Sequence, residues 1–600
     1  MLHSAMVSKP VYESTRGGEK GLSFRHVVLK GLADDGGLFV PSHLPRVDQQ
    51  QLDRWRTLPY TGLAFEILSL FIDEEDIPPT KLREIIQRSY SSFFIDDVLR
   101  VEPCYMGEAR EQQINVCELF HGPTFSFKDF ALQFLGHVFE YLLNTNALRK
   151  QQQQHPATGE KEDEEDPASV TRITVLGATS ALAGLRGKKN VEVFVLHPHG
   201  RVSHIQEKQM TTITDPNVHN ISVEGTFDDC QKLVKDTFAD LAFKRKHNLA
   251  AINSINWARI LAQTVYYFYS YFQVTSPAQQ KAGAKVVFSV PTGNFGNVLA
   301  GFYAKQMGLP VHHFIVATNQ NDILHRFFAS GKYEKKIVMP SFSPSMDIQV
   351  SSNFERFFYE IANRDSAKVT EWMNKFNETG VLDIPQDIHA KACSFMASYA
   401  VSEDQTLATV KRYKEDSNYI LCPHSAIGVY ALEQKWKELS ANVSYPVVFA
   451  SLATASPAKF ADAQQKALGY VLPLPQELER IMNLPSRCQK IEDGMVALKA
   501  IMEEASKSAC QSQSGESRLV GKRIRSRVPG SCANLGSGFD VFGIAVGLYL
   551  TTEIVVTERR VLASLIGRAS SCHNHLADAF PVMMADAFPV PRACRKVSPA

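Results

Sequence analysis

Short apolar runs alternate with longer amphipathic segments along most of the chain. The runs predict strands within 114–120, 173–180, 191–198, 286–297, 312–322 and 445–457, and helical patterns follow two of them, at 129–144 and 298–307. Alternation of this kind indicates an α/β fold with parallel sheets, whose loops gather at the carboxyl ends of the strands. We therefore expect ligands to bind at those ends.

Changes in this pattern predict the domain boundaries. Residues 1–110 carry helical patterns at 64–71 and 79–86 and form a predicted amino-terminal segment ahead of two α/β lobes at 111–500. Within the lobes, 147–168 combines a glutamine run with an acidic run, which predicts a solvated surface insertion. Residues 501–521 predict a polar linker, and 522–556 predict a strand, a loop and an apolar segment. We expect 557–600 to lack order.

Composition and charge exclude several classes of protein. The 600 residues are 44% hydrophobic and 21% charged, the balance of a soluble chain with several structural units. A net charge of +1 argues against a nucleic-acid partner. No apolar run is long enough to span a bilayer, and the ten cysteines are scattered singly, so we expect a reducing, cytoplasmic location and no membrane partner. Nothing in the sequence indicates an oligomeric state.

The stretch ELFHGPTFSFKDFALQFL holds the first candidate for chemistry. Lys128 lies where a loop enters a predicted helix, among Phe125, Phe127 and Phe130. Aromatic surroundings disfavour the charged form of a lysine and leave more free amine to attack a carbonyl carbon. The alternative is a surface lysine at a helix start. His121, which precedes a Gly-Pro pair, is interpreted as structural.

A Gly/Asn loop, SVPTGNFGN at 289–297, is the second candidate. Gly293 and Gly296 can adopt positive φ and Asn294 tolerates it, so several N–H groups could face one concavity at the start of the next helix. Asn297 could add a side-chain donor. An ordinary strand-to-helix turn is the alternative. Together, a reactive lysine and an anion cradle suit pyridoxal phosphate.

Three further groups are weaker candidates. In NSINWARI, a helix would place Asn253, Ser254 and Arg259 where they could grip an oxyanion, although the same groups could merely satisfy their neighbours. Thr454 ends the strand before SPAKF and could place a hydroxyl beside a pyridine nitrogen, or could help to cap a helix. The segment SCHNH at 571–575 lacks a second ligand cluster, so no metal site is predicted.

Taken together, these motifs resemble the threonine synthases, in their longer, fungal-type form. The likeness runs from about residue 12 to about 500 and includes HGPTFSFKDFALQFL, QMTTITDPNVHNISVEGTFDDCQ, INSINWARILAQTVYYFYSYF and VPTGNFGNVLAGFYAKQMGLP. The resemblance implies a two-lobed fold-type-II pyridoxal-phosphate enzyme with an amino-terminal extension. Its reaction converts O-phospho-L-homoserine and water to L-threonine and phosphate.

The resemblance also implies roles for individual residues. Lys128 would bind the cofactor covalently and then move protons at Cα and Cβ of the substrate. The cofactor phosphate would be held by Gly293, Asn294, Phe295, Gly296 and Asn297, and its pyridine nitrogen would meet Thr454. The substrate phosphate would be bound by Asn253, Ser254 and Arg259, and Thr179 and Ser180 would also bind the substrate.

The sequence departs from the family pattern at three places. After Ser180 the family has a loop like GDTGSAA that receives the substrate carboxylate, whereas here only residues 177–190 separate two predicted strands. Ser456 stands where the family has His, and Cys422 stands where it usually has Asp. The short connection motivates an alternative, a relative that binds the cofactor without catalysis.

A second resemblance covers about 30 residues near the carboxyl end. RVPGSCANLGSGFDVFGIAVGLYL, within 522–556, is similar to the amino end of homoserine kinase, a member of the GHMP kinase family. The phosphate loop of that family, of the type PxxxGLGSSA, does not follow. We therefore expect a remnant of a fusion rather than a working kinase.

Overall fold

The computed structural model describes residues 9–106, 112–153, 172–177, 182, 184–188, 190–200, 202, 204–225, 227–251, 254–492, 494–517, 523–532, 544–557 and 560–566. The chain divides into two compact units, Met1–Met502 and Glu503–Ala600. No helix in the described part of the chain has the length and apolar character needed to cross a membrane.

A six-stranded sheet forms the centre of the larger lobe. Its strands, from one edge to the other, are β13 (Met396–Ala400), β10 (Val311–Thr318), β9 (Lys285–Pro291), β14 (Val447–Ala453), β4 (Gln112–Glu118) and β3 (Arg100–Met106). All neighbours are parallel except β3, which pairs with β4 antiparallel. The parallel sheet predicted from the apolar runs is therefore confirmed, with one antiparallel strand at its edge.

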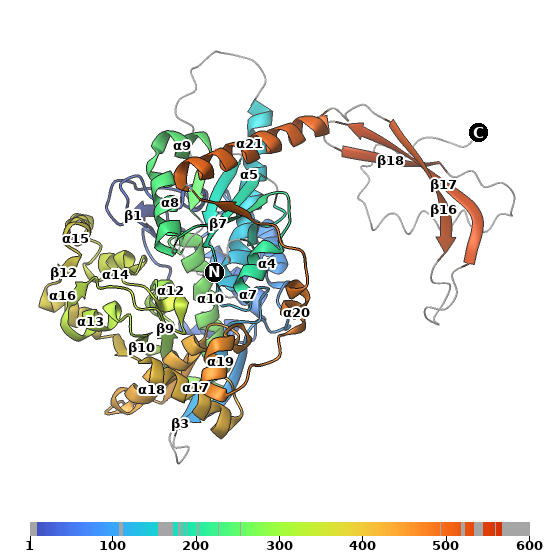
Figure 1. Ribbon diagram of the computed structural model, residues 1–600. Coiled ribbons are helices and arrows are strands. Elements are labelled where there is room, and N and C mark those ends of the chain that lie inside the picture. The colour runs from blue at the N-terminus through green and yellow to red at the C-terminus, as the bar shows by residue number, and fades with distance from the viewer. Residues whose placement is uncertain are drawn as a thin grey trace, which may run out of the picture. The chain divides into compact units, whose positions relative to one another are not determined.

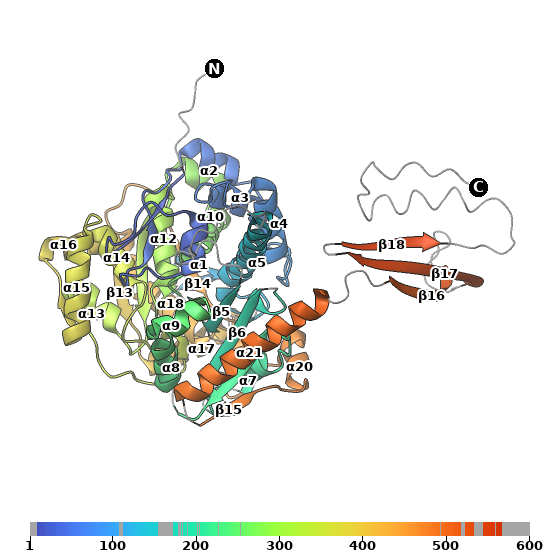
Figure 2. The ribbon, with the colours of Figure 1, turned by 90° about the horizontal axis from the view of Figure 1, so that it is seen from above.

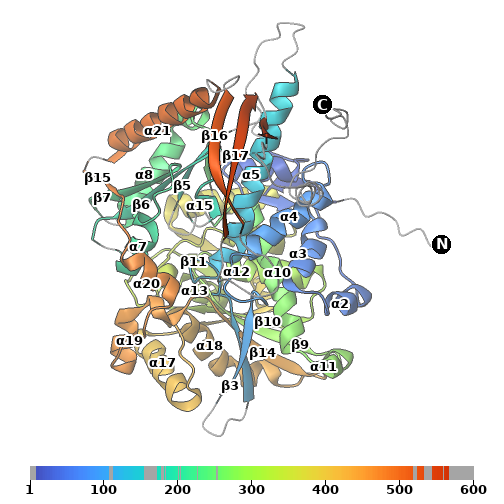
Figure 3. The same cartoon turned by 90° about the vertical axis from the view of Figure 1, so that its right-hand side faces the viewer.

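Both faces of this sheet are buried, which explains why its central strands β9 and β14 are mostly apolar. On β9, Val286, Phe288 and Val290 join a core with helices α10 (Trp257–Val274) and α12 (Gly296–Met307). The intervening Val287 joins a second core with α18 (Pro423–Ser440). Figure 3 shows α18 together with α17 (Glu403–Ser417) and α19 (Ala461–Leu468), and shows α10 near α12.

The smaller lobe is built on a fully parallel sheet. Its order is β15 (Gln489–Ile491), β7 (Val218–Val223), β6 (Val191–Pro198), β5 (Ile173–Gly177) and β8 (Leu249–Ala251). Helices α8 (Phe227–Ala239), α9 (Leu241–Lys246) and α21 (Gly494–Ser517) lie beside one another near β7 (Figure 1). Lys499 of α21 donates to Asp240 at 2.6 Å.

The short connection between β5 and β6 closes as a parallel crossover. Ile173 pairs with Val191, so the two strands are direct neighbours. Gly184 of the connection and Gly136 of α5 (Lys128–Gln153) bring two backbones into contact, because a Cβ on Gly184 would overlap the carbonyl of Leu132. Two glycines thus let the connection lie directly on α5.

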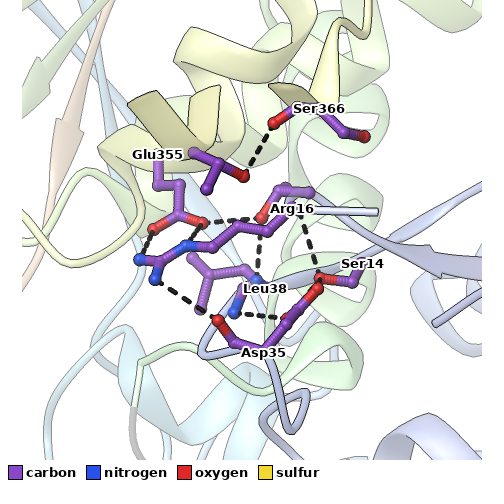
Figure 4. A network of polar contacts seen from close by, with 9 residues as sticks. Ser14, Arg16, Asp35, Leu38, Glu355 and Ser366 are labelled. Atoms are coloured by element: carbon purple, nitrogen blue, oxygen red, sulfur yellow. Dashed lines mark hydrogen bonds and ion pairs between the residues drawn. The ribbon is translucent and has the colours of Figure 1, made fainter. Parts of the chain in front are cut away.

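The amino-terminal segment packs against the larger lobe through a polar network (Figure 4). Arg16 donates to both carboxylate oxygens of Glu355, at 3.1 and 2.9 Å, and Thr15 Oγ1 donates to Glu355 at 2.7 Å. Asp35 accepts from Ser14 Oγ at 2.8 Å. Bidentate pairing of this kind fixes orientation as well as charge. The elements of the amino-terminal segment are β1 (Tyr12–Ser14), α1 (Phe24–Lys30), β2 (Phe39–Pro41), α2 (Gln49–Trp55), α3 (Tyr60–Ser69) and α4 (Pro79–Tyr90).

Helix α4 also lies side by side with α5 (Figure 2). The remaining elements of the larger unit are α7 (His204–Thr211), α11 (Pro277–Lys281), α13 (Ile323–Ser330), β11 (Lys332–Glu334), η2 (Pro344–Met346), α14 (Phe354–Ile361), α15 (Ser366–Thr379), β12 (Val381–Asp383), α16 (Gln386–Cys393), η3 (Pro457–Lys459) and α20 (Gln476–Met482).

Two helices are longer than the sequence pattern predicts. Helix α5 continues to Gln153, into the predicted surface insertion, whose residues from 154 onward lie outside the described part. Helix α21 covers residues 501–517, which were predicted as a linker. Leu498 and Met502 are fully buried and anchor α21, and the polar stretch after them contains no proline to end the helix.

The second unit contains a three-stranded antiparallel sheet, β16 (Arg523–Cys532), β17 (Ile544–Thr557) and β18 (Arg560–Ile566). The first two strands lie where a strand and an apolar segment are predicted. Strand β18 lies in 557–600, where no order is predicted. The segment SCHNH lies outside the described residues.

Candidate active site

A loop ahead of α5 places Lys128 at the carboxyl end of β14. Lys128 is the first residue of α5. The preceding loop pairs with the chain that leaves β14: Phe127 N donates to Thr454 O at 2.9 Å, and Ser456 N donates to Phe125 O at 3.2 Å. Phe125 has a φ of 55°, a left-handed conformation that reverses the loop. The lysine therefore occupies the loop-to-helix junction that the sequence predicts.

Asp129 fixes the conformation of this loop from inside. Its side chain is fully buried, and its carboxylate accepts from Thr124 N and Thr124 Oγ1, each at 2.8 Å. Burial raises the pKa of Asp129 to about 6, although the bonds from Thr124 act in the opposite direction. The loop is thus closed by hydrogen bonds before Lys128 begins the helix.

The electrostatic surroundings of Lys128 favour its free amine. Its pKa is lowered to about 8, first by burial and then by the positive charges of Arg259 and Lys459. In the sequence, the phenylalanines near Lys128 indicate the first of these causes, burial. The two cations reach Lys128 only through the fold, so their effect is not visible in the local pattern.

The loop between β9 and α12 forms an anion cradle. The residue with positive φ is Phe295, at 63°, and not Gly293 or Gly296 as predicted. The glycines are needed for close packing instead, because a Cβ on Gly293 would lie 2.8 Å from the carbonyl oxygen of Ser345. A left-handed residue just ahead of a helix turns successive N–H groups toward one concavity.

Asn297 presents a side-chain donor at this cradle. Its Oδ1 accepts from the hydroxyl groups of Tyr266 and Tyr267, each at 2.7 Å. This pairing orients Nδ2, which is buried and has no hydrogen-bond partner among the described residues. An unpaired buried donor beside a backbone cradle fits a phosphate oxygen. The residues present therefore fit the phosphate group of pyridoxal phosphate.

Ser254 and Arg259 line the same cavity as the cradle and Lys128. Helix α10 begins only at Trp257, with Asn256 as its N-cap, so the helical arc predicted from residue 253 is wrong. Ser254 lies in a turn before the helix, and only Arg259 is helical. The asparagine caps the helix through a bond from Ala258 N to its Oδ1 at 3.1 Å, which is why the helix starts there.

Arg259 is a buried cation with unused donor capacity. Its side chain is 8% exposed, and its Nε has no partner among the described residues. Burial lowers the pKa of Arg259 to about 10, so it remains a cation near neutral pH. The other predicted substrate ligands, Asn253, Thr179 and Ser180, lie outside the described residues.

Thr454 follows β14 and lines the cavity beside Lys128. Its position is supported by α18, because Thr454 N donates to Ser425 Oγ at 3.2 Å. Ser425 N in turn donates to Cys422 Sγ at 3.4 Å. The cysteine that replaces the family's Asp therefore still caps α18, with a weaker acceptor.

A buried pair that the sequence analysis missed joins the cradle to the Ser254 turn. Asn353 Nδ2 donates to Ser254 O at 3.0 Å and to Asn294 O at 3.2 Å. Arg356 donates to Asn353 Oδ1 and to Ile255 O, each at 2.6 Å. Both side chains are fully buried. The sequence signal for this pair is the polar run 351–353, which comes directly before the amphipathic stretch FERFF.

His424 and Lys459 also line the site without having been predicted. The pKa of His424 is lowered to about 3, first by burial and then by the charges of Lys128 and Lys459, so its imidazole is neutral. His424 lies in the segment CPHSA and Lys459 in the segment SPAKF. In these segments the residues that depart from the family pattern are the neighbouring Cys422 and Ser456.

Two adjoining cavities make up the site. One is lined by the cradle, Ser254 and Arg259, and the other by Lys459 and α7. Both are lined by Phe127, Lys128, Ser345, His424 and Thr454. Lys128 therefore lines both the cavity of the anion cradle and the cavity of Lys459.

Comparisons with known proteins agree with this architecture. Family models described as threonine synthase N terminus and threonine synthase, C-terminal match residues 11–90 and 425–502. The threonine synthase of Saccharomyces cerevisiae is 44% identical over 529 residues, which are 83% of this chain and 98% of that protein. The threonine synthase of Schizosaccharomyces pombe is 45% identical over 490 residues, 77% and 90% of the two chains.

Solved structures show the same similarity in three dimensions. The crystal structure of threonine synthase from yeast superposes with a TM-score of 0.73 at 43% identity, covering 83% of this chain and 99% of that one. A pyridoxal-phosphate-bound threonine synthase from Brucella melitensis gives a TM-score of 0.72 at 36% identity, covering 83% and 100%.

The two parallel lobes, the lysine at a helix start and the anion cradle define a fold-type-II pyridoxal-phosphate protein. The predicted fold class is confirmed. With relatives this similar over nearly their whole length, the chain belongs to the threonine synthase family.

Proposed function

We propose that the chain is a threonine synthase, which converts O-phospho-L-homoserine and water to L-threonine and phosphate with pyridoxal phosphate as cofactor. The observation that carries this proposal is the convergence of Lys128, with its pKa of about 8, and the 293–297 cradle in one cavity. The relatives named above bear this activity in their names.

The residues around the cavity divide the work of binding. Gly293, Asn294, Phe295, Gly296 and Asn297 hold the cofactor phosphate, and Lys128 carries the cofactor covalently. Thr454 would supply a hydroxyl group to the ring end of the bound cofactor. Ser254 and Arg259, with Asn253 before them, bind an anionic group of the substrate, and Thr179 and Ser180 contribute from the segment after β5.

Proton transfer falls to Lys128. The cofactor, when bound, supplies the electron sink for carbanion chemistry. With the cofactor bound, the amine of Lys128 would act as base and acid, removing protons from Cα and Cβ of the substrate and returning protons to Cγ and Cα. Phosphate would leave from Cγ, which gains a proton in its place, and water would add at Cβ. A pKa near 8 suits this role because both protonation states are populated.

The proposal is tested by assaying release of phosphate and threonine from O-phospho-L-homoserine by the chain loaded with pyridoxal phosphate. Lys128→Ala should lower turnover by roughly 10³-fold or more. Lys305→Ala is a matched control, because Lys305 is a partly buried lysine whose pKa is also lowered to about 8, and it lines neither cavity. Folded, cofactor-loaded protein that releases neither product would overturn the proposal.

Three further expectations from the sequence concern an alternative without catalysis, the segment 522–556 and the location of the protein. The non-catalytic alternative rested on the short connection after Ser180, and the comparisons give it no support. The likeness of 522–556 to homoserine kinase rests on sequence alone, since neither family model extends beyond residue 502. We also propose a cytoplasmic location, on the basis of the cysteine pattern.

A further inference from the structure

The second cavity holds a lysine to which the chemistry above gives no role. This cavity is lined by Lys128, Lys459 of η3, and Gln206 and Gln209 of α7, among others. Because Lys128 lines this cavity as well as the cavity of the cradle, a molecule bound in the second cavity would reach Lys128.

Lys459 is a cation without a carboxylate partner in the described part of the chain. Its Nζ donates to Thr124 O at 2.7 Å. Burial lowers the pKa of Lys459 to about 8, and the nearest acidic influence, Asp129, is itself engaged by Thr124. A neutral carbonyl offsets little of the cost of burying an ammonium, so such a group favours binding of an anion.

The substrate of the proposed reaction has two anionic ends, a carboxylate and a phosphate. Arg259 and Ser254 line only the first cavity, where one of these ends can bind next to the cofactor cradle. Lys459 lines only the second cavity. Both cations lower the pKa of Lys128. Each of them lines a different one of the two cavities that Lys128 shares.

We infer that Lys459 is a second anion subsite of the active site, which binds one end of O-phospho-L-homoserine while Ser254 and Arg259 bind the other. Gln209 from α7 contributes to the same corner, since its Nε2 donates to Thr124 O at 3.4 Å. The inference rests on the proposed function for the identity of the substrate. It does not rest on the residues after Ser180.

The inference is tested with three ligands on the full chain loaded with pyridoxal phosphate. Substrate KM is taken from turnover. The affinities of inorganic phosphate and of L-2-aminobutyrate, which has the substrate's carboxylate but no phosphate, are taken from calorimetry. Lys459→Met should raise the substrate KM by roughly 10–100-fold, as expected for loss of a charged hydrogen bond, and leave cofactor affinity and kcat much less affected.

The two probes separate the possible sources of the anion. Loss of phosphate affinity with L-2-aminobutyrate binding retained assigns the phosphate end to Lys459, and the opposite pattern assigns the carboxylate. Lys459→Gln provides a second variant in case the methionine variant does not fold. Lys305→Met, at a partly buried lysine whose pKa is also lowered to about 8, is the matched control and should change none of these values.

The inference is overturned if both Lys459 variants bind all three ligands within about twofold of the parent chain. Unchanged binding in the Lys459 variants can be told apart from failure of the proposed function. A parent chain that binds both probes through Lys459 but releases no threonine would sink the proposed reaction and leave the anion subsite standing.

Discussion

At the scale of single residues, the positive charge around Lys128 determines how its amine responds to pH. A group with a pKa of about 8 is largely protonated at pH 7 and largely free at pH 9. The rate at which Lys128 bonds to added pyridoxal phosphate should therefore rise about fivefold from pH 7 to 8 and level off above about pH 9. Stopped-flow absorbance of the apoprotein measures this rate. A rise of about tenfold per pH unit continuing to pH 10 would show an unperturbed lysine.

The sequence could identify Lys128 and the cradle because their motifs are local. A lysine among phenylalanines and a Gly/Asn turn are each contained within ten residues. His424, Lys459 and Asn353 could not be found this way, because their roles depend on strands and helices that meet only in the fold. The φ of Phe295 is a similar case: the sequence predicts the turn, but the residue that adopts the left-handed conformation is Phe295 and not a glycine.

At the scale of elements, strands were easier to predict than helix ends. A strand buried on both faces is mostly apolar, and β6 matches its predicted range of 191–198 without a shift. Helix ends depend on caps and tertiary contacts. Helix α21 runs past its expected end because buried Leu498 and Met502 anchor it, while α10 starts late because Asn256 caps it.

The contact between α5 and the β5–β6 connection yields a prediction at this scale. Gly184→Ala should lower the free energy of unfolding by about 1–3 kcal/mol, because the added Cβ would overlap the carbonyl of Leu132. Gly62→Ala is the control: its Cβ would meet Pro59 at an ordinary 3.4 Å, and helix propensity should raise stability by about 0.5–1 kcal/mol. Urea denaturation of both variants measures the difference. Equal stability of the two would contradict the close backbone contact.

At the scale of the whole molecule, the described site residues all belong to the unit that ends at Met502. The match to the threonine synthase of Saccharomyces cerevisiae covers 83% of this chain and 98% of that protein. A chain ending at Ser517, after α21, should therefore keep the cofactor affinity and substrate KM of the full chain within about twofold. Titration with pyridoxal phosphate and initial rates compare the two chains. A larger loss would show that the carboxyl-terminal unit supports the active site.

The network of Figure 4 also constrains how the chain is made. Arg16 and Glu355 are 339 residues apart, and at roughly 5–20 residues per second a ribosome needs roughly 17–70 s to synthesise the interval between them. The amino-terminal helices also pack on apolar residues that are synthesised later, such as Phe268, which contacts Trp55. The first segment to emerge is thus among the last to fold, and during that wait its apolar faces need protection from aggregation.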